Sequence, residues 1–434
     1  MITVSTARGD SPGTRRRAGT SRVPRRVTAG LAALGLLATT LVAAAGPASG
    51  GLPARWVGTW GTALTAPSLA NTGSSLNGFT DQSIRQLVRV SLGGEKVRLR
   101  ITNAYGTGPL TIGHASVGLP VSPGSPQLQP GSIREITFNG SETAVVYKGA
   151  ELLTDPIDLP VSATAELAVT LYLPTATGAT SWHWTARQTS YVYAGDKAED
   201  LTGAGQTAAY NHFYYLAGIE VLTKTGAGTV VVLGDSISDG SGSTLGANTR
   251  WPDYLATRVT GTWPALGDPG VLNVSLAGNQ VTKDGLAINS PALGDSALAR
   301  LDDDVFSQPG VRTVIVELGI NDVHLSGFPA DQIIGGLRQL AIQAKDRGVR
   351  VVAATLGPFE GYSTWTADKE AVRQAVNTWL RGSNEFDALL DFDQILRDPA
   401  APSKVLPAYD SGDHIHPNDA GAQALAAAVP LWLL

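Results

Sequence analysis

The spacing of apolar residues changes near residues 226–228, and this change limits the folds that the chain can adopt. From residue 55 to 218, apolar and polar residues alternate in short runs separated by Pro, Gly, Ser and Asn, which is typical of β-strands. After residue 228, apolar runs of strand length alternate with longer segments of helical period. That second pattern is typical of a parallel sheet covered by helices. The sequence therefore predicts an all-β region followed by an α/β region.

The first region is interpreted as a β-sandwich accessory domain over residues 55–225. The alternating runs 84–90 and 97–101, joined by Ser91-Leu92-Gly93-Gly94-Glu95, predict a β-hairpin. Further strands are expected at 133–138, 144–147, 166–173, 190–194 and 214–221. Several short strands at this spacing, with no long helical segment between them, favour an all-β sandwich that is jelly-roll-like.

The second region, residues 229–434, is predicted to be a doubly wound α/β domain. Strands are expected at 229–233, 271–274, 312–318, 350–355 and 388–392. Helices are expected at 251–259, 295–308, 330–347, 367–381 and 418–434. Strands that alternate with helices form a parallel sheet with helices on both faces.

The first fifty residues have the pattern of a secretory signal. Seven arginines and one acid precede an apolar run at 31–45, which ends in the small residues of 43–48. The run is too short to span a bilayer as a stable helix, although an uncleaved membrane anchor is the alternative. The pair Arg25-Arg26 suggests export by the twin-arginine route, but the residues that follow it fit the general secretion route better. We expect an extracellular protein with no stable membrane association once the signal is removed.

Composition excludes several classes of partner and chemistry. The full chain has a formal net charge of −5, and without the seven arginines and one acid of residues 1–50 the remainder carries −11. This balance disfavours nucleic acids and anionic membranes as partners. The absence of cysteine excludes disulfides, thiolate metal sites and a cysteine nucleophile. His114, His183, His212 and His324 are interpreted as structural or surface residues, so no metal or other cofactor is expected; the oligomeric state stays open.

Four polar clusters follow predicted strands or precede the last predicted helix. They are Gly-Asp-Ser-Ile-Ser-Asp-Gly at 234–240, Asn-Val-Ser-Leu-Ala-Gly-Asn at 273–279, Gly-Ile-Asn-Asp at 319–322 and Asp-His-Ile-His at 413–416. In a doubly wound sheet, the carboxyl ends of the strands converge in one crevice where ligands bind. The sequence therefore predicts one site built from all four clusters.

These clusters contain the groups that acyl transfer requires. Ser236 is the candidate nucleophile, His416 the base that takes its proton, and Asp413 the group that orients the imidazole. The backbone N–H groups of Ser236 and Gly278, with the side-chain amide of Asn321, are the candidate oxyanion donors. A serine here could instead cap a helix, and Asn321 could form an Asx turn.

The four clusters resemble the blocks of the SGNH, or GDSL, hydrolase family. The resemblance covers the chain from about residue 229 to the C-terminus and implies a flavodoxin-like three-layer α/β/α fold. It also implies metal-independent hydrolysis of esters. One departure is His414, which stands where many members have glycine and leaves two imidazoles as candidate bases; the spacing from Asp413 favours His416. The G-x-S-x-G motif of the more common serine hydrolases is not met, because Ser238 occupies the last glycine position.

The substrate is open at this stage. Acyl esters of polysaccharide are favoured, acetyl first and feruloyl second, because of the export signal, the β-sandwich beside the catalytic region and the tryptophans available for stacking on sugars. The sandwich also resembles the accessory domain that precedes SGNH domains in some secreted carbohydrate esterases, but such a resemblance does not assign a substrate. A lipase or phospholipase with the same triad and a noncatalytic carbohydrate-binding protein are the alternatives. The candidate substrate-binding residues are Asp235, Asn279, Trp182 and His183, although core packing is the favoured role for Trp182 and its neighbour Trp184.

Overall fold

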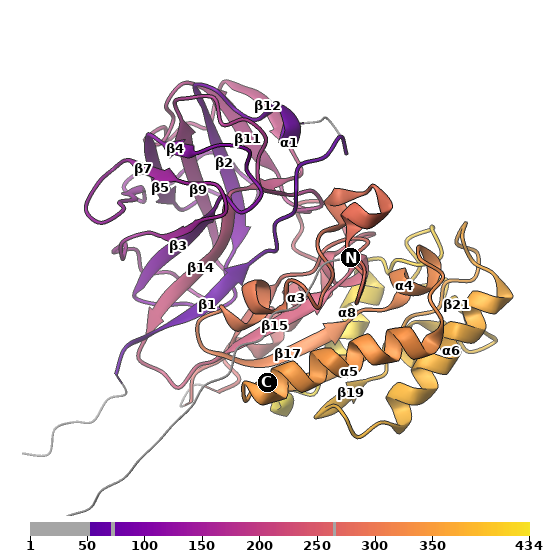
Figure 1. The fold of residues 1–434 in the computed structure, drawn as a ribbon. Helices are drawn as coiled ribbons and strands as arrows, with labels where there is room; N and C mark the ends of the chain where they lie inside the picture. The colour runs from indigo at the N-terminus through magenta and orange to yellow at the C-terminus, as the bar shows by residue number, and fades with distance from the viewer. Residues whose placement is uncertain (1–52, 71–73, 264–265) are drawn as a thin grey trace, which may run out of the picture. The chain divides into compact units, whose positions relative to one another are not determined.

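The computed structural model describes residues 53–70, 74–263 and 266–434 of the chain (Figure 1). The export signal predicted in residues 1–50 lies outside the described residues. None of the described helices has the length and apolar character that a bilayer span requires.

The first part of the chain is a β-sandwich, as predicted. Two antiparallel sheets share one hydrophobic cluster, which contains residues between Val57 and Ala227 and also Ala292 from the second part of the chain. The four-stranded sheet has the order β1 (Arg55–Gly61), β14 (Leu216–Thr223), β3 (Lys96–Thr102), β8 (Glu151–Leu153). The six-stranded sheet has the order β12 (Gln206–Tyr210), β11 (Ser190–Ala194), β2 (Gln82–Arg89), β9 (Glu166–Leu173), β5 (His114–Gly118), β6 (Arg134–Glu135). Two small ribbons, β4 (Leu110–Ile112) with β7 (Ala144–Val146) and β10 (Trp182–His183) with β13 (Phe213–Tyr214), and the short helix α1 (Ser74–Asn77) complete the described elements of this part.

The predicted hairpin at 84–101 is wrong, because its two strands lie in different sheets. β2 pairs with β9 and β11, whereas β3 pairs with β14 and β8. The connection crosses between the sheets: Val90 N–H donates to Ala165 O at 2.9 Å, and Ser91 N–H donates to Thr59 O at 2.8 Å. β2 is buried on both faces, including Arg85 and Gln86. Alternation predicted the strands correctly but carried no information about their partners.

The second part of the chain contains the predicted parallel sheet. Its order is β16 (Gly270–Asn273), β15 (Thr229–Gly234), β17 (Val311–Glu317), β18 (Arg350–Ala354), β19 (Ala388–Leu390), with every pair parallel. β15 is buried along its whole length, as its run of Val and Leu predicts. A two-stranded ribbon of β20 (Arg397–Asp398) and β21 (Ala401–Val405) follows the last strand.

Helices cover both faces of this sheet, so the three-layer α/β/α prediction is confirmed. α5 and α6 pack against each other in front of the sheet, and α8 lies behind it, in contact with α3 (Figure 1). The longer helices are α3 (Trp251–Val259), α5 (Ala330–Asp346), α6 (Ala367–Gly382) and α8 (Asp419–Ala428). The short helices α2 (Ser236–Asp239), α4 (Ile320–His324) and α7 (Phe392–Leu396) follow β15, β17 and β19.

Two predicted helices are shorter in the structure. Over 295–308, only a five-residue π-helical turn forms, at Asp302–Phe306. The preceding backbone is bound elsewhere, since Ser296 N–H donates to the Asp284 carboxylate and Ala297 N–H to Gln280 O. The last helix ends at Ala428, because Pro430 has no N–H with which to continue it.

The sandwich meets the parallel sheet along β1 and β16. Gly58 N–H donates to Pro309 O at 3.2 Å, and Val271 N–H donates to Ser91 Oγ at 2.8 Å. The backbones approach so closely that a Cβ at Gly270 would lie 1.9 Å from Gly58 O, so only glycine fits there. These contacts place β1 beside β16, one of the two edge strands of the parallel sheet.

Candidate active site

The turn that ends β15 presents Ser236 at the start of α2. Asp235 occupies the N-cap position, and its Oδ1 accepts a hydrogen bond from Ile237 N–H at 3.1 Å. The capping role considered for Ser236 is therefore taken by its neighbour. Ser236 is free to use its hydroxyl elsewhere, and its Oγ lies 2.8 Å from His416 Nε2.

His416 is oriented by Asp413 on the loop before α8. Its Nδ1 lies 2.5 Å from Asp413 Oδ2, while Asp413 Oδ1 accepts from His416 N–H at 2.9 Å. A carboxylate accepts only, so Nδ1 carries the ring proton and the unprotonated Nε2 faces Ser236. Burial alone would raise the pKa of Asp413, but its hydrogen bonds with His416, and the positive charge of that ring when it is protonated, outweigh burial and hold the pKa below its usual range. The carboxylate therefore stays charged.

The second histidine of this loop pairs with a different carboxylate and has no hydrogen bond to Ser236. His414 Nδ1 lies 2.7 Å from Asp410 Oδ2, and its side chain is half exposed. The structure thus brings Ser236, His416 and Asp413 into one hydrogen-bonded chain and leaves His414 in a separate pair.

Three N–H donors lie on the segments around Ser236. Among the described residues, the backbone N–H groups of Ser236 and Gly278 have no acceptor. The turn that carries Gly278 is held on both sides, since Leu276 N–H donates to Gly234 O at 3.1 Å and Asn279 N–H to Leu276 O at 3.0 Å. Free, fixed N–H groups of this kind are what a developing oxyanion requires.

The third donor is the side-chain amide of Asn321, whose nitrogen and oxygen each have a hydrogen-bond partner. Nδ2 donates to Asp235 Oδ2 at 3.1 Å, which leaves its second hydrogen free. Oδ1 lies 2.8 Å from His324 Nε2, so His324 must donate through that nitrogen. Burial, with smaller contributions from the charges of Lys369 and His416, lowers the pKa of His324 to about 4 and keeps the ring neutral.

Sequence reasoning treated His324 as a structural or surface residue and missed this contact. The signal was its position three residues after Asn321 at the start of a helix, because residues at that spacing lie on one face. His324 belongs to none of the four clusters, and only the directions of the side chains in the structure identify Asn321 as its partner.

A pair of buried carboxyl groups lies behind the nucleophile. Burial raises the pKa of Asp235 to about 7. Burial, followed by the charge of Asp235, raises the pKa of Glu317 well above its usual value. Glu317 also accepts from Ser238 Oγ at 2.9 Å, and Trp251 Nε1 donates to the same hydroxyl. Burial thus favours the protonated form of both carboxyl groups, which limits the negative charge next to Ser236.

The four candidate substrate-binding residues are buried, and their role in substrate binding stays a prediction. The exposed fractions are 0% for Asp235 and Trp182, 1% for Asn279 and 2% for His183. Asn279 Nδ2 donates to Leu293 O and Asp295 O, while Trp182 packs in the sandwich core. Their positions in the sequence suggested a place near Ser236. A motif does not show that each side chain points inward to other protein groups.

Comparison with known proteins places this arrangement in a family. Residues 232–424 match the GDSL-like Lipase/Acylhydrolase family. This part of the chain belongs to that family. The chain is accordingly a hydrolase of ester bonds, as the four sequence clusters predicted. No curated protein matched the chain.

Solved structures similar to the GDSL hydrolase share little sequence with it. A variant of Axe2, an acetyl xylan esterase from Geobacillus stearothermophilus, is 23% identical, with a TM-score of 0.34, over 47% of this chain and 94% of that one. A GDSL-like lipase from Bacteroides thetaiotaomicron is 18% identical, with a TM-score of 0.34, over 46% and 84%. The psychrotrophic esterase EstA from Pseudoalteromonas sp. is 21% identical, with a TM-score of 0.33, over 46% and 91%.

Proposed function

We propose that this GDSL hydrolase is a secreted serine esterase that forms an acyl-enzyme on Ser236. The observation that carries the proposal is the hydrogen-bonded chain from Ser236 through His416 to Asp413, with the free N–H groups of Ser236 and Gly278 beside it. Nucleophile, base and oxyanion donors are the parts that acyl transfer needs.

Acylation begins when Ser236 Oγ attacks the ester carbonyl carbon and its proton moves to His416 Nε2. Asp413 stabilises the imidazolium that results. The carbonyl oxygen becomes an oxyanion and accepts hydrogen bonds from Ser236 N–H, Gly278 N–H and the free hydrogen of Asn321 Nδ2. When the C–O bond of the ester breaks, His416 returns the proton to the leaving alcohol.

Deacylation repeats these steps with water. His416 Nε2 takes a proton from the water molecule, whose oxygen attacks the acyl carbon. The same donors stabilise the second oxyanion. Collapse of this intermediate releases the carboxylic acid, and the proton held by His416 returns to Ser236 Oγ.

The substrates that we propose are acyl groups on polysaccharide, acetyl first and feruloyl second. Ser236 exposes only 8% of its surface, and acetyl is the acyl group that needs the least room beside it. The predicted export signal and the accompanying β-sandwich favour an extracellular polymer as the alcohol part.

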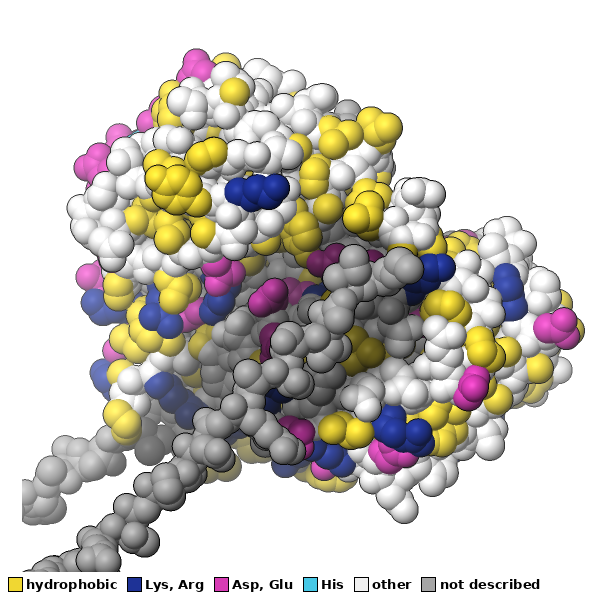
Figure 2. Space-filling view, viewed as in Figure 1, with side chains coloured by type: hydrophobic (Ala, Val, Ile, Leu, Met, Phe, Trp, Pro, Cys, Tyr) yellow, Lys and Arg dark blue, Asp and Glu magenta, His cyan; other side chains and the backbone are white. Residues whose placement is uncertain are grey.

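A lipase or phospholipase is the less favoured candidate. Such an enzyme needs a continuous apolar surface near its site. Figure 2 shows one face of the molecule, on which no histidine is visible and apolar side chains lie in several separate groups between polar and charged ones. The net charge of −11 outside residues 1–50 also opposes binding to anionic lipid.

The first experiment measures hydrolysis of p-nitrophenyl acetate by the wild type and by Ser236→Ala. We expect the variant to retain the wild-type fold by circular dichroism and to lose at least about a thousandfold in kcat. Hydrolysis by the variant close to the wild-type rate would identify another nucleophile. A wild type that hydrolyses no ester but binds polysaccharide would support the noncatalytic alternative.

A second series compares acetyl, butyryl, octanoyl and feruloyl esters and measures acetate release from acetylated xylan. Highest kcat/KM on acetyl esters, with release from the polymer, supports the proposed substrate class. A preference for octanoyl esters would favour the lipase. Export is tested separately, by expression in a secreting bacterium and N-terminal sequencing of the protein in the medium.

A further inference from the structure

A buried pair of His183 and Asp239 joins the sandwich to the nucleophile helix. His183 lies on β10 of the sandwich, and Asp239 is the last residue of α2. His183 Nε2 lies 2.9 Å from Asp239 Oδ1, and each side chain is 2% exposed. Neither residue takes part in the mechanism described above.

Both ring nitrogens of His183 have a protein partner. Nδ1 lies 2.9 Å from Ala63 O, and a carbonyl accepts only, so Nδ1 carries a proton and donates. Nε2 lies against the Asp239 carboxyl group. The two contacts, at opposite sides of the ring, fix its orientation between the sandwich and α2.

Asp239 also binds the turn that carries Gly278, one of the candidate oxyanion donors. Its Oδ2 accepts from Ala277 N–H at 3.0 Å and also from the Thr185 hydroxyl of the sandwich. Ala277 directly precedes Gly278, whose N–H has no acceptor among the described residues. On the other side, α2 fixes Asp239 relative to Ser236, because Asp239 N–H donates to Asp235 O at 2.8 Å.

We propose that His183 is a positioning residue for ester hydrolysis. It holds the Asp239 carboxylate, which in turn fixes the distance between the N–H of Gly278 and that of Ser236. The sandwich is then a structural part of the active site, and its contribution applies to small substrates as well as to polymers. This inference rests on the proposed acyl-enzyme mechanism, since it concerns the oxyanion donors of that mechanism.

The test compares His183→Ala with a matched variant, Arg89→Ala. Arg89 also joins the two parts of the chain, donating to Thr257 Oγ1 at 3.1 Å on α3, but it does not contact Asp239. With p-nitrophenyl acetate, His183→Ala should lower kcat by roughly tenfold or more while KM changes by less than about twofold. Arg89→Ala should leave both constants within about twofold of the wild type. Equal losses in the two variants would overturn the proposal, because a general loosening of the interface would then explain both.

A double-mutant cycle separates positioning from simple structural support. If His183 acts through the oxyanion donors, His183→Ala and Asn321→Ala affect one function, and their losses in kcat should be clearly less than additive. Additive losses would overturn the proposal. Should His183→Ala fail to fold by circular dichroism, Thr185→Val carries the same cycle, because it removes only one hydroxyl contact with Asp239.

The outcome for Ser236→Ala distinguishes failure of this inference from failure of the proposed function. An inactive Ser236→Ala beside a fully active, folded His183→Ala would refute the positioning role alone. Activity retained by Ser236→Ala would refute the acyl-enzyme mechanism and this inference with it.

Discussion

At the scale of single residues, the loop before α8 contains two histidine–carboxylate pairs, and only one of them reaches Ser236. His416 bonds to Ser236 and Asp413, whereas His414 bonds to Asp410 and has a left-handed backbone, with φ of 72°. Glycine adopts that conformation without strain. Substitutions at these two histidines can therefore show which of them is the base.

We expect His416→Ala to lower kcat on p-nitrophenyl acetate by at least about a thousandfold, because His416 is the one described residue whose side chain is hydrogen-bonded to Ser236 Oγ. His414→Gly is the matched change, two residues away on the same loop, and should leave kcat within about threefold. Steady-state kinetics of both variants provides the measurement. A larger loss in His414→Gly than in His416→Ala would assign the base to His414.

Asn321 is a donor fixed by two partners, so its removal should affect the transition state more than substrate binding. Asn321→Ala should lower kcat by about a hundredfold, or roughly 3 kcal/mol, with little change in KM. His324→Ala leaves the amide in place but frees its oxygen, so a smaller loss of kcat is expected. A rise in KM alone for Asn321→Ala would instead make Asn321 a substrate-binding residue.

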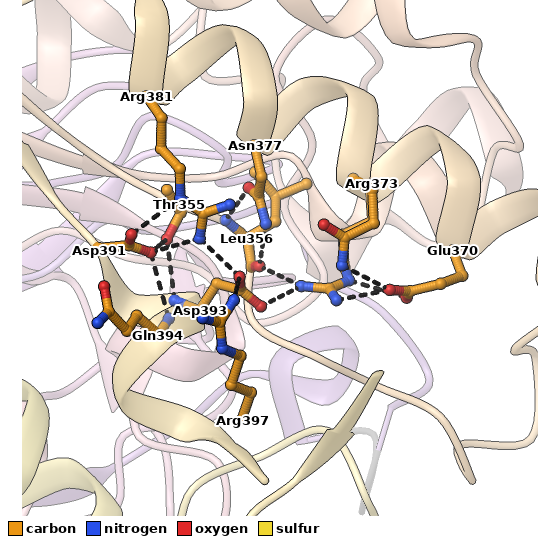
Figure 3. Close-up of polar contacts among 11 residues, drawn as sticks. Thr355, Leu356, Glu370, Arg373, Asn377, Arg381, Asp391, Asp393, Gln394 and Arg397 are labelled. Carbon is orange, nitrogen blue, oxygen red and sulfur yellow. Dashed lines mark hydrogen bonds and ion pairs between the residues drawn. The ribbon is translucent and has the colours of Figure 1, made fainter. Parts of the chain in front are cut away.

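At the scale of elements, a buried ionic network fixes α6 to the ends of β18 and β19 (Figure 3). Arg373 on α6 is fully buried, donates to Leu356 O at 2.9 Å and contacts the buried Asp393 at 2.5 Å. Arg381 contacts Asp391 and Asp393 from the same helix. Breaking a buried pair leaves an uncompensated charge or carbonyl, which is more costly than the loss of an exposed pair.

Arg373→Met should therefore lower the free energy of unfolding by about 3 kcal/mol, the lower end of the range for buried pairs, since Arg381 still neutralises Asp393. Lys224→Met is the matched control, because Lys224 pairs with Glu95 where both side chains are more than half exposed, and should change stability by less than about 1 kcal/mol. Urea denaturation measures both values. A similar loss in the two variants would show that the network contributes little.

At the scale of the whole chain, the sandwich covers the edge strand β16 through β1. Removal of the sandwich exposes the unpaired edge of β16 and the apolar side chain of Leu272, and exposed edges of this kind promote aggregation. The division into independently folding domains at about residue 226 stays a prediction.

We expect a chain truncated to residues 225–434 to be aggregated, or to be soluble with a lower kcat on p-nitrophenyl acetate than the full chain. Size-exclusion chromatography and the ester assay measure these properties. A soluble, monomeric and fully active truncated chain would show that the sandwich is an independent module.

Most of the elements could be predicted from periodicity, because a strand buried on both faces and an amphipathic helix each have their own pattern. α3 has the predicted bounds, and β15 extends the prediction by one residue. Pairing could not be predicted, as β2 and β3 show, because it depends on which distant strand covers each edge. The region 295–308 has helical composition, yet its N–H groups bind carbonyl and carboxylate partners from the loop at 280–284.

The sequence by itself determined the chemistry of the site: a serine after a buried strand, a histidine three residues after an aspartate, and donors at the ends of parallel strands. Those features are local or follow from strand direction, so residue order contains them. The tertiary structure decided which histidine faces Ser236, which polar groups are buried, and which residues hold the donors in place. His324, Glu317 and His183 belong to that second set, because their contacts depend on side-chain directions and on segments separated by as many as 79 residues.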